Sequence, residues 1–130
     1  MSVTAATPSS RRMKGGKPWN GMKWCRPSTR FAIYHRDRFA CIYCESTTKL
    51  SLDHLVPEEL GGTHVMTNLV TSCFSCNSAR GAKPLRVWLR YLREQGVNTS
   101  KIPARIRKSV KRELDREVGR RLVVMMKGRA

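Results

Sequence analysis

Two Cys-x-x-Cys pairs constrain the fold of this 130-residue chain more than any other feature of its sequence. They are Cys41/Cys44 and Cys73/Cys76, with residues 45–72 between them. A Cys-x-x-Cys turn supplies two thiolates from one tight knuckle, and structural zinc binds four thiolates in a tetrahedron. We therefore expect one structural zinc ion that joins the two segments, with redox-active dithiols as the alternative. Four thiolates leave no open position for chemistry on the ion.

The number of cysteines also bears on the compartment. Five is an odd number, which does not suit a secreted disulfide framework, and Cys25 has no partner at knuckle spacing. We expect Cys25 to be a free thiol. No apolar run approaches the roughly 20 residues that span a bilayer, and the N-terminus lacks the apolar segment of a signal peptide. The expected location is the cytoplasm, with no membrane partner.

Positive charge is concentrated at the two ends of the chain. The formal net charge is +17. Residues 1–27 hold six basic and no acidic side chains, residues 101–130 hold eleven basic and three acidic ones, and residues 28–100 are nearly balanced. Basic flanks of this kind suit a nucleic-acid partner, because lysine and arginine that neutralise phosphates release condensed counterions. A solvated, nonspecifically binding protein of ribosomal type is the alternative.

The pattern along the chain predicts an α+β protein. Residues 1–27 are rich in Ser, Thr, Gly, Pro and basic residues, and we expect a flexible arm whose Trp19 and Trp24 dock on the domain or stack on a base. Ser28 is the expected N-cap of a first helix, "TRFAIYHRD". The predicted strands are "KLSLDHLV" and a segment within "GGTHVMTNLVTSC". We expect these elements to begin a core that spans residues 28–96.

Helices are predicted for the rest of the chain. One begins at "FSCNSARGAK" and breaks at Lys83-Pro84, and the next is "PLRVWLRYLREQG", with Arg86 and Arg90 on its polar face and Gly96 as its cap. Apolar residues then recur every four positions from Ile106 to Leu122. Residues 97–130 are therefore expected to form one long basic helix, from about Pro103 to Met126, that packs on the core.

The stretch "LSLDHLVPEELGG" places Asp53 and His54 side by side in an apolar segment. Burying such a pair costs roughly several kcal/mol unless the groups are paired or bind a metal ion. The zinc ion would bring this strand beside Asn77, so the Asp53 carboxylate and the Asn77 amide form a possible site for a hard divalent ion. His54 would then deprotonate water, because imidazole titrates near neutral pH. A buried Asp53–His54 pair that only stabilises a zinc ribbon is the alternative.

The segments "CIYC", "LDHLVPEELGGTHVMTNLV" and "CFSCNSARG", with the approach "YHRDRFACIYC", resemble the HNH endonucleases in order and spacing. The resemblance covers about residues 30–83. It implies a small zinc-stapled ββα-metal core with flanking helices. It also implies that Asp53 and Asn77 bind the catalytic ion, that His54 is the general base, and that Asn68 fixes the loop and orients the histidine.

The resemblance carries further expectations. Gly61 and Gly62 match the loop turn of the family, and Arg80 matches a basic position that faces the scissile phosphate, with Lys83 beside it. Asn77 replaces the last histidine, which makes an HNN variant. Because an amide binds soft metals poorly, we expect Mg²⁺, Mn²⁺ or another hard divalent ion rather than zinc for catalysis. His64 is interpreted as a surface residue, or otherwise as an added phosphate or metal contact.

The resulting hypothesis is a metal-dependent endonuclease that cuts double-stranded DNA to 5′-phosphate and 3′-hydroxyl ends. The helix with Arg86 and Arg90 would bind the flanking backbone. A bacterial or phage-infected cell is the expected setting, with a phage terminase or another targeting protein as a candidate partner. Two alternatives stay open at this point: a zinc-stapled module that binds nucleic acid without cutting it, and a ribosome-associated RNA binder.

Overall fold

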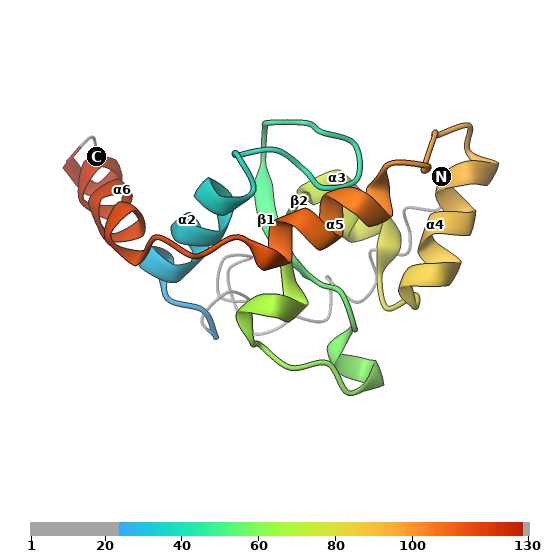
Figure 1. Cartoon of the computed structure of the whole chain (residues 1–130), viewed down its shortest axis with the longest axis horizontal. Coiled ribbons are helices and arrows are strands. Elements are labelled where there is room, and N and C mark those ends of the chain that lie inside the picture. Colours follow the sequence, from blue (N-terminus) through green and yellow to red (C-terminus); the bar gives the residue numbers. More distant parts are fainter. Residues whose placement is uncertain (1–23, 129–130) are drawn as a thin grey trace.

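A two-stranded antiparallel sheet with helices on both sides forms the centre of the molecule (Figure 1). The computed structural model describes residues 24–128, and the basic arm before Trp24, including Trp19, lies outside the described residues. The α+β class is confirmed. None of the helices within the described range combines the length and the apolar character needed to cross a membrane. The elements in chain order are α2 (Pro27–Arg36), β1 (Leu50–His54), η3 (Glu58–Leu60), η4 (Met66–Asn68), β2 (Leu69–Cys73), α3 (Phe74–Arg80), α4 (Leu85–Glu94), α5 (Ile102–Lys111) and α6 (Arg116–Gly128).

The hairpin and α3 form a ββα unit. Strand β1 pairs with β2 in a register that places Leu50 opposite Cys73 and His54 opposite Leu69. Helix α3 follows β2 directly, and Cys73 is its N-cap, with its sulfur accepting a hydrogen bond from the backbone N–H of Cys76. Because side chains alternate along a strand, Asp53 and His54 leave β1 on opposite faces. The side chains of Asp53 and His54, at the end of β1, therefore lie in two different environments.

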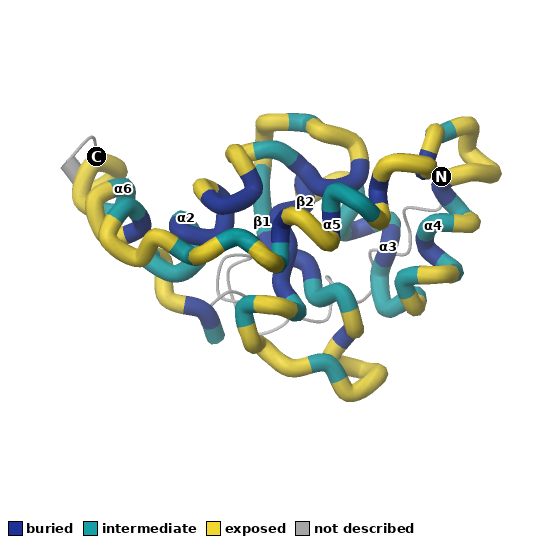
Figure 2. Tube along the Cα trace, in the orientation of Figure 1, coloured by how far each residue is buried: buried dark blue, intermediate teal, exposed yellow. Residues whose placement is uncertain are grey.

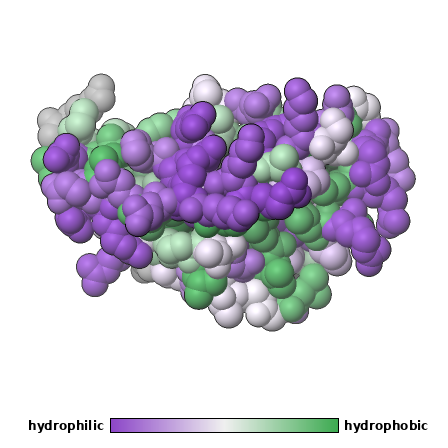
Figure 3. Space-filling model, in the orientation of Figure 1, coloured by the Kyte–Doolittle hydropathy of each residue, from purple (hydrophilic) through white to green (hydrophobic). Residues whose placement is uncertain are grey.

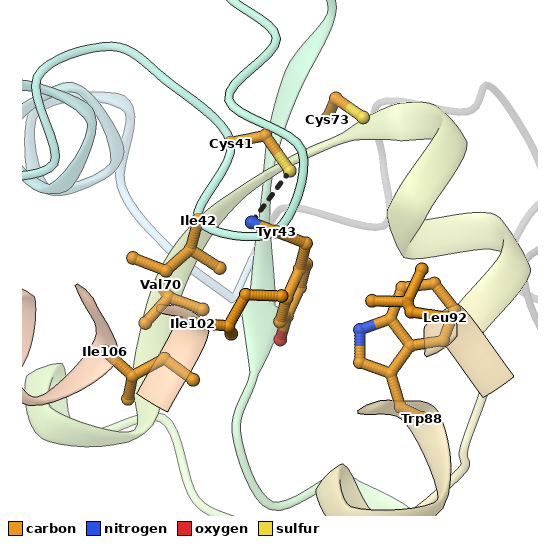
Figure 4. Packing of buried hydrophobic residues seen from close by; sticks show 9 residues of the cluster. All are labelled: Cys41, Ile42, Tyr43, Val70, Cys73, Trp88, Leu92, Ile102 and Ile106. Carbon is orange, nitrogen blue, oxygen red and sulfur yellow. Dashed lines mark hydrogen bonds between the residues drawn. The ribbon is translucent and has the colours of Figure 1, made fainter. Parts of the chain in front are cut away.

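Apolar residues pack on both faces of the hairpin. On one face Ile42 and Tyr43, from the knuckle before β1, pack with Val70 of β2, Trp88 of α4 and Ile102 of α5 (Figure 4). On the other face a second cluster consists of Cys25, Ile33, Tyr34, Leu52 and Leu69. Figure 2 shows the buried residues concentrated along the centre, where α2, the hairpin and α5 meet, while the loop after β1 is largely exposed. The two clusters hold the hairpin firmly on either side.

A buried carboxylate joins α2, β2 and α5. Asp37 accepts hydrogen bonds from the backbone N–H of Thr71 at 2.8 Å, from the Ser109 hydroxyl, and from the guanidinium of Arg36 at 2.9 Å. Arg36 also donates to the carbonyls of Met66 and Leu69. The charges of both buried side chains are thereby paired, as a buried ion pair requires. Distant parts of the sequence are fixed to one another at this point.

The prediction of one long C-terminal helix is wrong, because residues 112–115 interrupt it. Arg112 is extended, with φ −73° and ψ 143°, and its guanidinium donates to the carbonyl of Arg36. Asp115 then accepts from the backbone N–H of Val118, which is the usual role of an aspartate at a helix N-terminus. The apolar four-residue repeat continues through the break, so periodicity alone did not reveal it.

Helix α6 packs closely against α2 at Gly119. A Cβ atom at this position would lie 2.1 Å from the carbonyl oxygen of Ser28 and 3.0 Å from the Cβ of Ala32. Only glycine permits so close an approach of the two helices. The start of α2 also differs from the prediction, since Pro27 occupies the first turn and Arg26 the N-cap in place of Ser28. Proline suits the first helical position because its missing N–H would be unpaired there anyway.

Candidate active site

The four cysteines of the two Cys-x-x-Cys pairs lie together, as predicted. All four sulfurs lie within 4.8 Å of one another, and the sulfurs of Cys44 and Cys73 are 3.6 Å apart. Sulfurs bound at about 2.3 Å around a tetrahedral ion lie about 3.8 Å from one another. The cluster therefore has the size of a four-thiolate zinc site. It joins the knuckle at residues 41–44 to the junction of β2 and α3.

Backbone N–H groups point at the sulfurs of the cluster. Tyr43 and Cys44 donate to the sulfur of Cys41 at 3.4 and 3.5 Å (Figure 4 shows the first), and Cys76 donates to that of Cys73 at 3.4 Å. Such bonds stabilise thiolates. A hydrogen bond from the Cys76 thiol, together with these backbone donors, lowers the pKa of Cys41 to about 4, and the same thiol–thiol bond raises the pKa of Cys76. The donor set and its hydrogen bonds fit zinc.

Asp53 lies on the closed face of β1, where its side chain is held by two others. Its Oδ2 atom accepts a hydrogen bond from the Tyr43 hydroxyl at 2.5 Å and one from Nη1 of Arg80 at 2.7 Å, and the residue is 6% exposed. Burial, with the nearby charge of Asp53, raises the pKa of Tyr43 well above its ordinary value, so the phenol stays protonated and donates. Tyr43 lies between the two cysteines of the first pair, so the knuckle directly contacts Asp53.

Arg80 is fully buried, with an exposed fraction of 0%. Besides Asp53, its guanidinium donates to the carbonyls of His54 at 2.9 Å, Leu55 at 2.7 Å and Lys83 at 3.0 Å. Burial alone would lower the pKa of Arg80, but the charge of Asp53 raises it, so the side chain stays charged. The resemblance implied that Arg80 contacts the phosphate. In the structure Arg80 is buried and pairs with the Asp53 carboxylate, because a buried carboxylate needs a cation. Arg80 thereby fixes the backbone of residues 53–55.

Asn77 lies over the face of β1 that carries Asp53. Its amide donates to the Oγ of Ser51 and to the carbonyl of Leu52, both at 2.9 Å. Ser51 and Asp53 are two apart on one strand and so share a face. Within residues 24–128 no hydrogen bond joins Asp53 directly to Asn77. Since both amide hydrogens are donated, the Oδ1 atom of Asn77 is the one that would bind a cation.

Asn68 fixes the loop that follows β1. Its side chain accepts from the backbone N–H of Val56 at 2.9 Å and donates to the carbonyls of Val56 at 3.1 Å and Thr63 at 2.8 Å. The loop folds back tightly at Gly62, where a Cβ atom would lie 1.6 Å from the carbonyl oxygen of Val56. Gly61 before it is left-handed, with φ 95°. These contacts set the course of residues 55–68.

His54 leaves β1 on the open face, among residues of the loop and of the segment before α2. Its Nε2 atom lies 2.9 Å from Nδ1 of His64. The indole of Trp24 stacks on His64 with ring centroids 4.4 Å apart and is tilted against His54 at 4.9 Å. Trp24 thus docks on the domain, one of the two outcomes expected for it. Tyr43 was given no role from the sequence, and the contact of Trp24 with the two histidines was not predicted.

The remaining predicted basic residues divide between structural and exposed positions. The Nζ atom of Lys83 donates to the carbonyls of Ala79 at 2.9 Å and Arg80 at 3.4 Å, so it caps α3. Arg86 and Arg90 are exposed on α4. Figure 3 shows hydrophilic side chains in a band over α5 and over the α4 end of the molecule. The exposed basic residues of α5 and the turn before it are Lys101, Arg107, Lys108 and Lys111.

Cys25 is buried, and burial raises the pKa of its thiol. It lies apart from the four-cysteine cluster and is a free cysteine, as are all five cysteines of the chain within the described residues. His35, which was given no role, is exposed on α2.

Comparison with known proteins agrees with this geometry. The family model described as HNH endonuclease matches residues 41–86, which span the knuckle, the hairpin and α3. The CRISPR-associated endonuclease Cas9 of Corynebacterium diphtheriae is 31% identical over 96 residues. That alignment covers 71% of this chain but only 8% of the relative. No solved structure matches the chain.

The matched segment contains both cysteine pairs, the Asp53–His54 end of β1, and the two asparagines Asn68 and Asn77. The fold around these residues is the ββα unit described above, stapled by a cluster that fits zinc. Through residues 41–86, this chain belongs to the HNH endonuclease family, a family of nucleases.

Proposed function

We propose that the chain is a metal-dependent endonuclease that hydrolyses phosphodiester bonds of DNA. One observation carries the proposal: within the segment matched to HNH endonucleases, the end of β1 presents a carboxylate on one face and an imidazole on the other. Asn77 lies on the carboxylate face. Hydrolysis of a phosphodiester needs a cation near the phosphate and a base for water, and this arrangement offers both.

The catalytic cation would be held by Asp53 and Asn77. The hydrogen bonds to Asp53 from Tyr43 and Arg80 both fall on Oδ2, so Oδ1 of Asp53 and Oδ1 of Asn77 are the oxygens that would bind the ion. Two oxygen donors suit Mg²⁺ or Mn²⁺, which take water and phosphate oxygens as their other ligands. When bound, such an ion would supply charge stabilisation for the phosphate and the leaving oxygen. Tyr43 and Arg80 orient the carboxylate.

His54 is the proposed general base, which takes the proton of the attacking water. The contact between Arg80 and the carbonyl of His54, at 2.9 Å, fixes the backbone of this residue relative to Asp53. The hydrogen bonds of Asn68 to Val56 and Thr63 fix the loop beside it. Attack in line with the 3′ oxygen leaves a 5′ phosphate and a 3′ hydroxyl. The proposed base and cation ligand are thus adjacent residues held by different contacts: Tyr43 and Arg80 hold Asp53, and Asn68 holds the loop beside His54.

Exposed basic residues would hold the DNA backbone. Because Arg80 is buried, this role falls to Arg86 and Arg90 on α4 and to the basic row on α5. The net charge of +17 supports a polyanionic substrate. Double-stranded DNA is the proposed form of the substrate, and a phage terminase or another targeting protein is a proposed partner.

A second candidate function rests on the hydrogen bonds that Asp53 already makes to Tyr43 and Arg80. An ion at this carboxylate must share it with Arg80 and Tyr43, which already neutralise and orient it. If that pairing excludes the ion, the zinc-stapled scaffold would bind nucleic acid through its basic surfaces without cutting it.

Cleavage of supercoiled plasmid separates the two functions. We expect the native chain to nick or linearise the plasmid with Mg²⁺ or Mn²⁺, and His54→Ala to lose about 10²–10⁴-fold in rate while it keeps its fold and its DNA affinity. His35→Ala is the matched control, because His35 is exposed on α2, away from the site. Metal-independent retention of plasmid by all three proteins without any cleavage would support the binding module instead.

A further inference from the structure

Three metal-binding side chains meet on the open side of β1, apart from the four cysteines and from Asp53. One donor atom each from His54, Glu58 and His64 lies within 4.8 Å of the others. We propose that these residues form a second cation site, which takes a borderline transition ion such as Zn²⁺ and thereby stops cleavage. The ion-binding part stands on the geometry alone. The inhibition rests on the proposed function, because it requires that His54 be the base.

The distances within this triad suit a shared ion. One donor atom from each residue lies within 4.8 Å of the others, and Nε2 of His54 lies 2.9 Å from Nδ1 of His64. Oε2 of Glu58 now contacts the opposite ring nitrogen, Nε2 of His64, at 3.2 Å, so Glu58 must rotate to join an ion held between the two imidazoles. Ligand nitrogens at about 2.0–2.1 Å from a tetrahedral zinc ion lie about 3.3 Å apart. Small side-chain rotations would therefore open the space for an ion, which replaces the hydrogen between the two imidazoles.

The backbone that carries the triad is held in advance of binding. Asn68 binds Val56 and Thr63, which lie next to the segments that carry Glu58 and His64. Gly62 allows the loop to fold back against the carbonyl of Val56. Little further ordering is needed to bring the three donors together, and a preorganised site binds more tightly than a flexible one.

Trp24 covers one side of the triad. Its indole stacks on the His64 ring at an interplanar angle of 20° and leans against the His54 ring at 43°. The two imidazoles are thereby supported in orientation, much as outer contacts orient the ligands of known metal sites. On the other side the site is open, since the side chains of His64 and Glu58 are 41% and 53% exposed. An ion can reach the triad from solvent.

The donor set selects the class of ion. Two imidazoles and one carboxylate bind zinc in catalytic sites, and imidazole suits zinc, nickel and copper among divalent ions. Magnesium prefers six oxygen donors and keeps its water ligands. The triad should therefore not bind Mg²⁺ at the concentrations that support cleavage. The Asp53–Asn77 site, with oxygen donors only, has the opposite preference.

An ion bound at the triad would prevent His54 from acting as the base. An imidazole whose nitrogen binds an ion cannot accept a proton from water at that nitrogen. Because Asp53 and His54 leave β1 on opposite faces, zinc at the triad need not displace the ion at Asp53. Zinc is then both a structural requirement, through the cysteine cluster, and an inhibitor when it is in excess.

Binding is tested first, without reference to activity. The full chain is prepared with one zinc ion in the cysteine cluster, and further Zn²⁺ is titrated by calorimetry, with bound metal counted after equilibrium dialysis. We expect a second ion, whose affinity falls by about tenfold or more in His64→Gln and in Glu58→Gln. His35→Gln, the matched exposed histidine, should bind as the native chain does. Absence of a second ion, or a second ion unaffected by both triad variants, would overturn the site.

Inhibition is tested next, with plasmid cleavage in Mg²⁺ and increasing Zn²⁺. Each protein, with zinc in its cysteine cluster, is compared with its own rate before further Zn²⁺ is added, because His64 contacts the proposed base. We expect His64→Gln and Glu58→Gln to need about tenfold more zinc than the native chain for half inhibition. Equal inhibition of all proteins would refute an inhibitory triad and point to displacement at Asp53. If no protein cleaves under any condition while the second ion still binds, the proposed function fails and the site stands.

Discussion

The two faces at the end of β1 differ in almost every physical respect. On the closed face Asp53 is buried, its carboxylate is paired with Arg80, and the Tyr43 hydroxyl completes its hydrogen bonds. On the open face His54 lies among exposed side chains, with His64 and Glu58 within reach. At this end of β1, Tyr43 of the cysteine knuckle and Arg80 support the closed face, and the surface loop with His64 and Glu58, together with Trp24, borders the open one.

The difference shows how one strand can serve two chemical tasks. A carboxylate that holds a cation must keep one geometry, and burial with fixed hydrogen bonds provides this at the expense of desolvation. A base must exchange protons with water and meet a large substrate, so it needs an open setting. In the proposed function, residues 53 and 54 would meet both needs because adjacent strand residues face opposite ways. We therefore expect changes on the closed face to have larger effects on stability than changes on the exposed basic surface.

Loss of zinc should affect the closed face most. Structural zinc sites bind with apparent free energies of about 10–16 kcal/mol, comparable to the whole stability of about 5–15 kcal/mol of a small domain. We expect chelation, or Cys73→Ser, to unfold the hairpin and α3, as measured by circular dichroism during thermal melting with and without added zinc. Cys25→Ser, outside the cluster, should keep the zinc-dependent transition. A melting curve that chelator leaves unchanged would contradict a structural metal.

Removal of Arg80 should cost less than zinc but more than any exposed arginine. Arg80→Ala leaves the buried Asp53 carboxylate without its cation, a change that typically costs about 3–5 kcal/mol. Urea unfolding measures the loss. Arg86→Ala, on the exposed face of α4, is the matched control and should change the free energy of unfolding by no more than about 0.5 kcal/mol. Similar losses in both variants would show that Asp53 does not depend on Arg80.

The Tyr43 hydroxyl should contribute a smaller amount. Tyr43→Phe keeps the ring that meets Trp88 edge-on but removes the hydrogen bond to a charged carboxylate, for which we expect a loss of about 1.5–3 kcal/mol. Tyr34→Phe removes a bond to the Leu50 carbonyl and should cost only about 0.5–1.5 kcal/mol. Urea unfolding of the two variants tests the ranking. Equal losses would mean that the knuckle does not specially support Asp53.

The smallest effect is expected on the exposed basic surface. Arg90→Ala should weaken DNA binding a few-fold and reduce the slope of log affinity against log salt by about one, with unchanged stability. Glu94→Gln, on the same helix, should leave the slope unchanged or raise it. Fluorescence anisotropy with duplex DNA at several salt concentrations measures both. An unchanged slope in Arg90→Ala would remove α4 from the proposed DNA surface.

The sequence was most informative where the signal is local. The spacing of Cys41, Cys44, Cys73 and Cys76 predicted one four-cysteine cluster, and the two segments "KLSLDHLV" and "GGTHVMTNLVTSC" predicted the two strands. Asn77 was identified by its place after the second cysteine pair and Asn68 by resemblance, and both contact the backbone near β1. Short-range spacing and turn chemistry are visible in sequence because few other arrangements satisfy them.

Features that depend on long-range contacts were not predicted. The Arg80–Asp53 pair joins residues 27 apart, and the Ser109–Asp37 bond joins residues 72 apart. Neither partner indicates the other in the sequence. The break before α6 was hidden because Asp115 lies inside a continuous apolar repeat, although an aspartate three residues before Val118 is a capping signal. Glu58 and His64 meet only because the loop folds back at Gly62.

The most direct test of the two-faced strand compares ion binding with cleavage in the same variants. Mn²⁺ affinity, measured by electron paramagnetic resonance on zinc-loaded protein, should fall about tenfold or more in Asp53→Asn and in Asn77→Ala but stay at the native value in His54→Ala, while plasmid cleavage is lost in all three. Mn²⁺ binding that depends on His54, or that survives the loss of both Asp53 and Asn77, would contradict the assignment of ligand and base to opposite faces of β1.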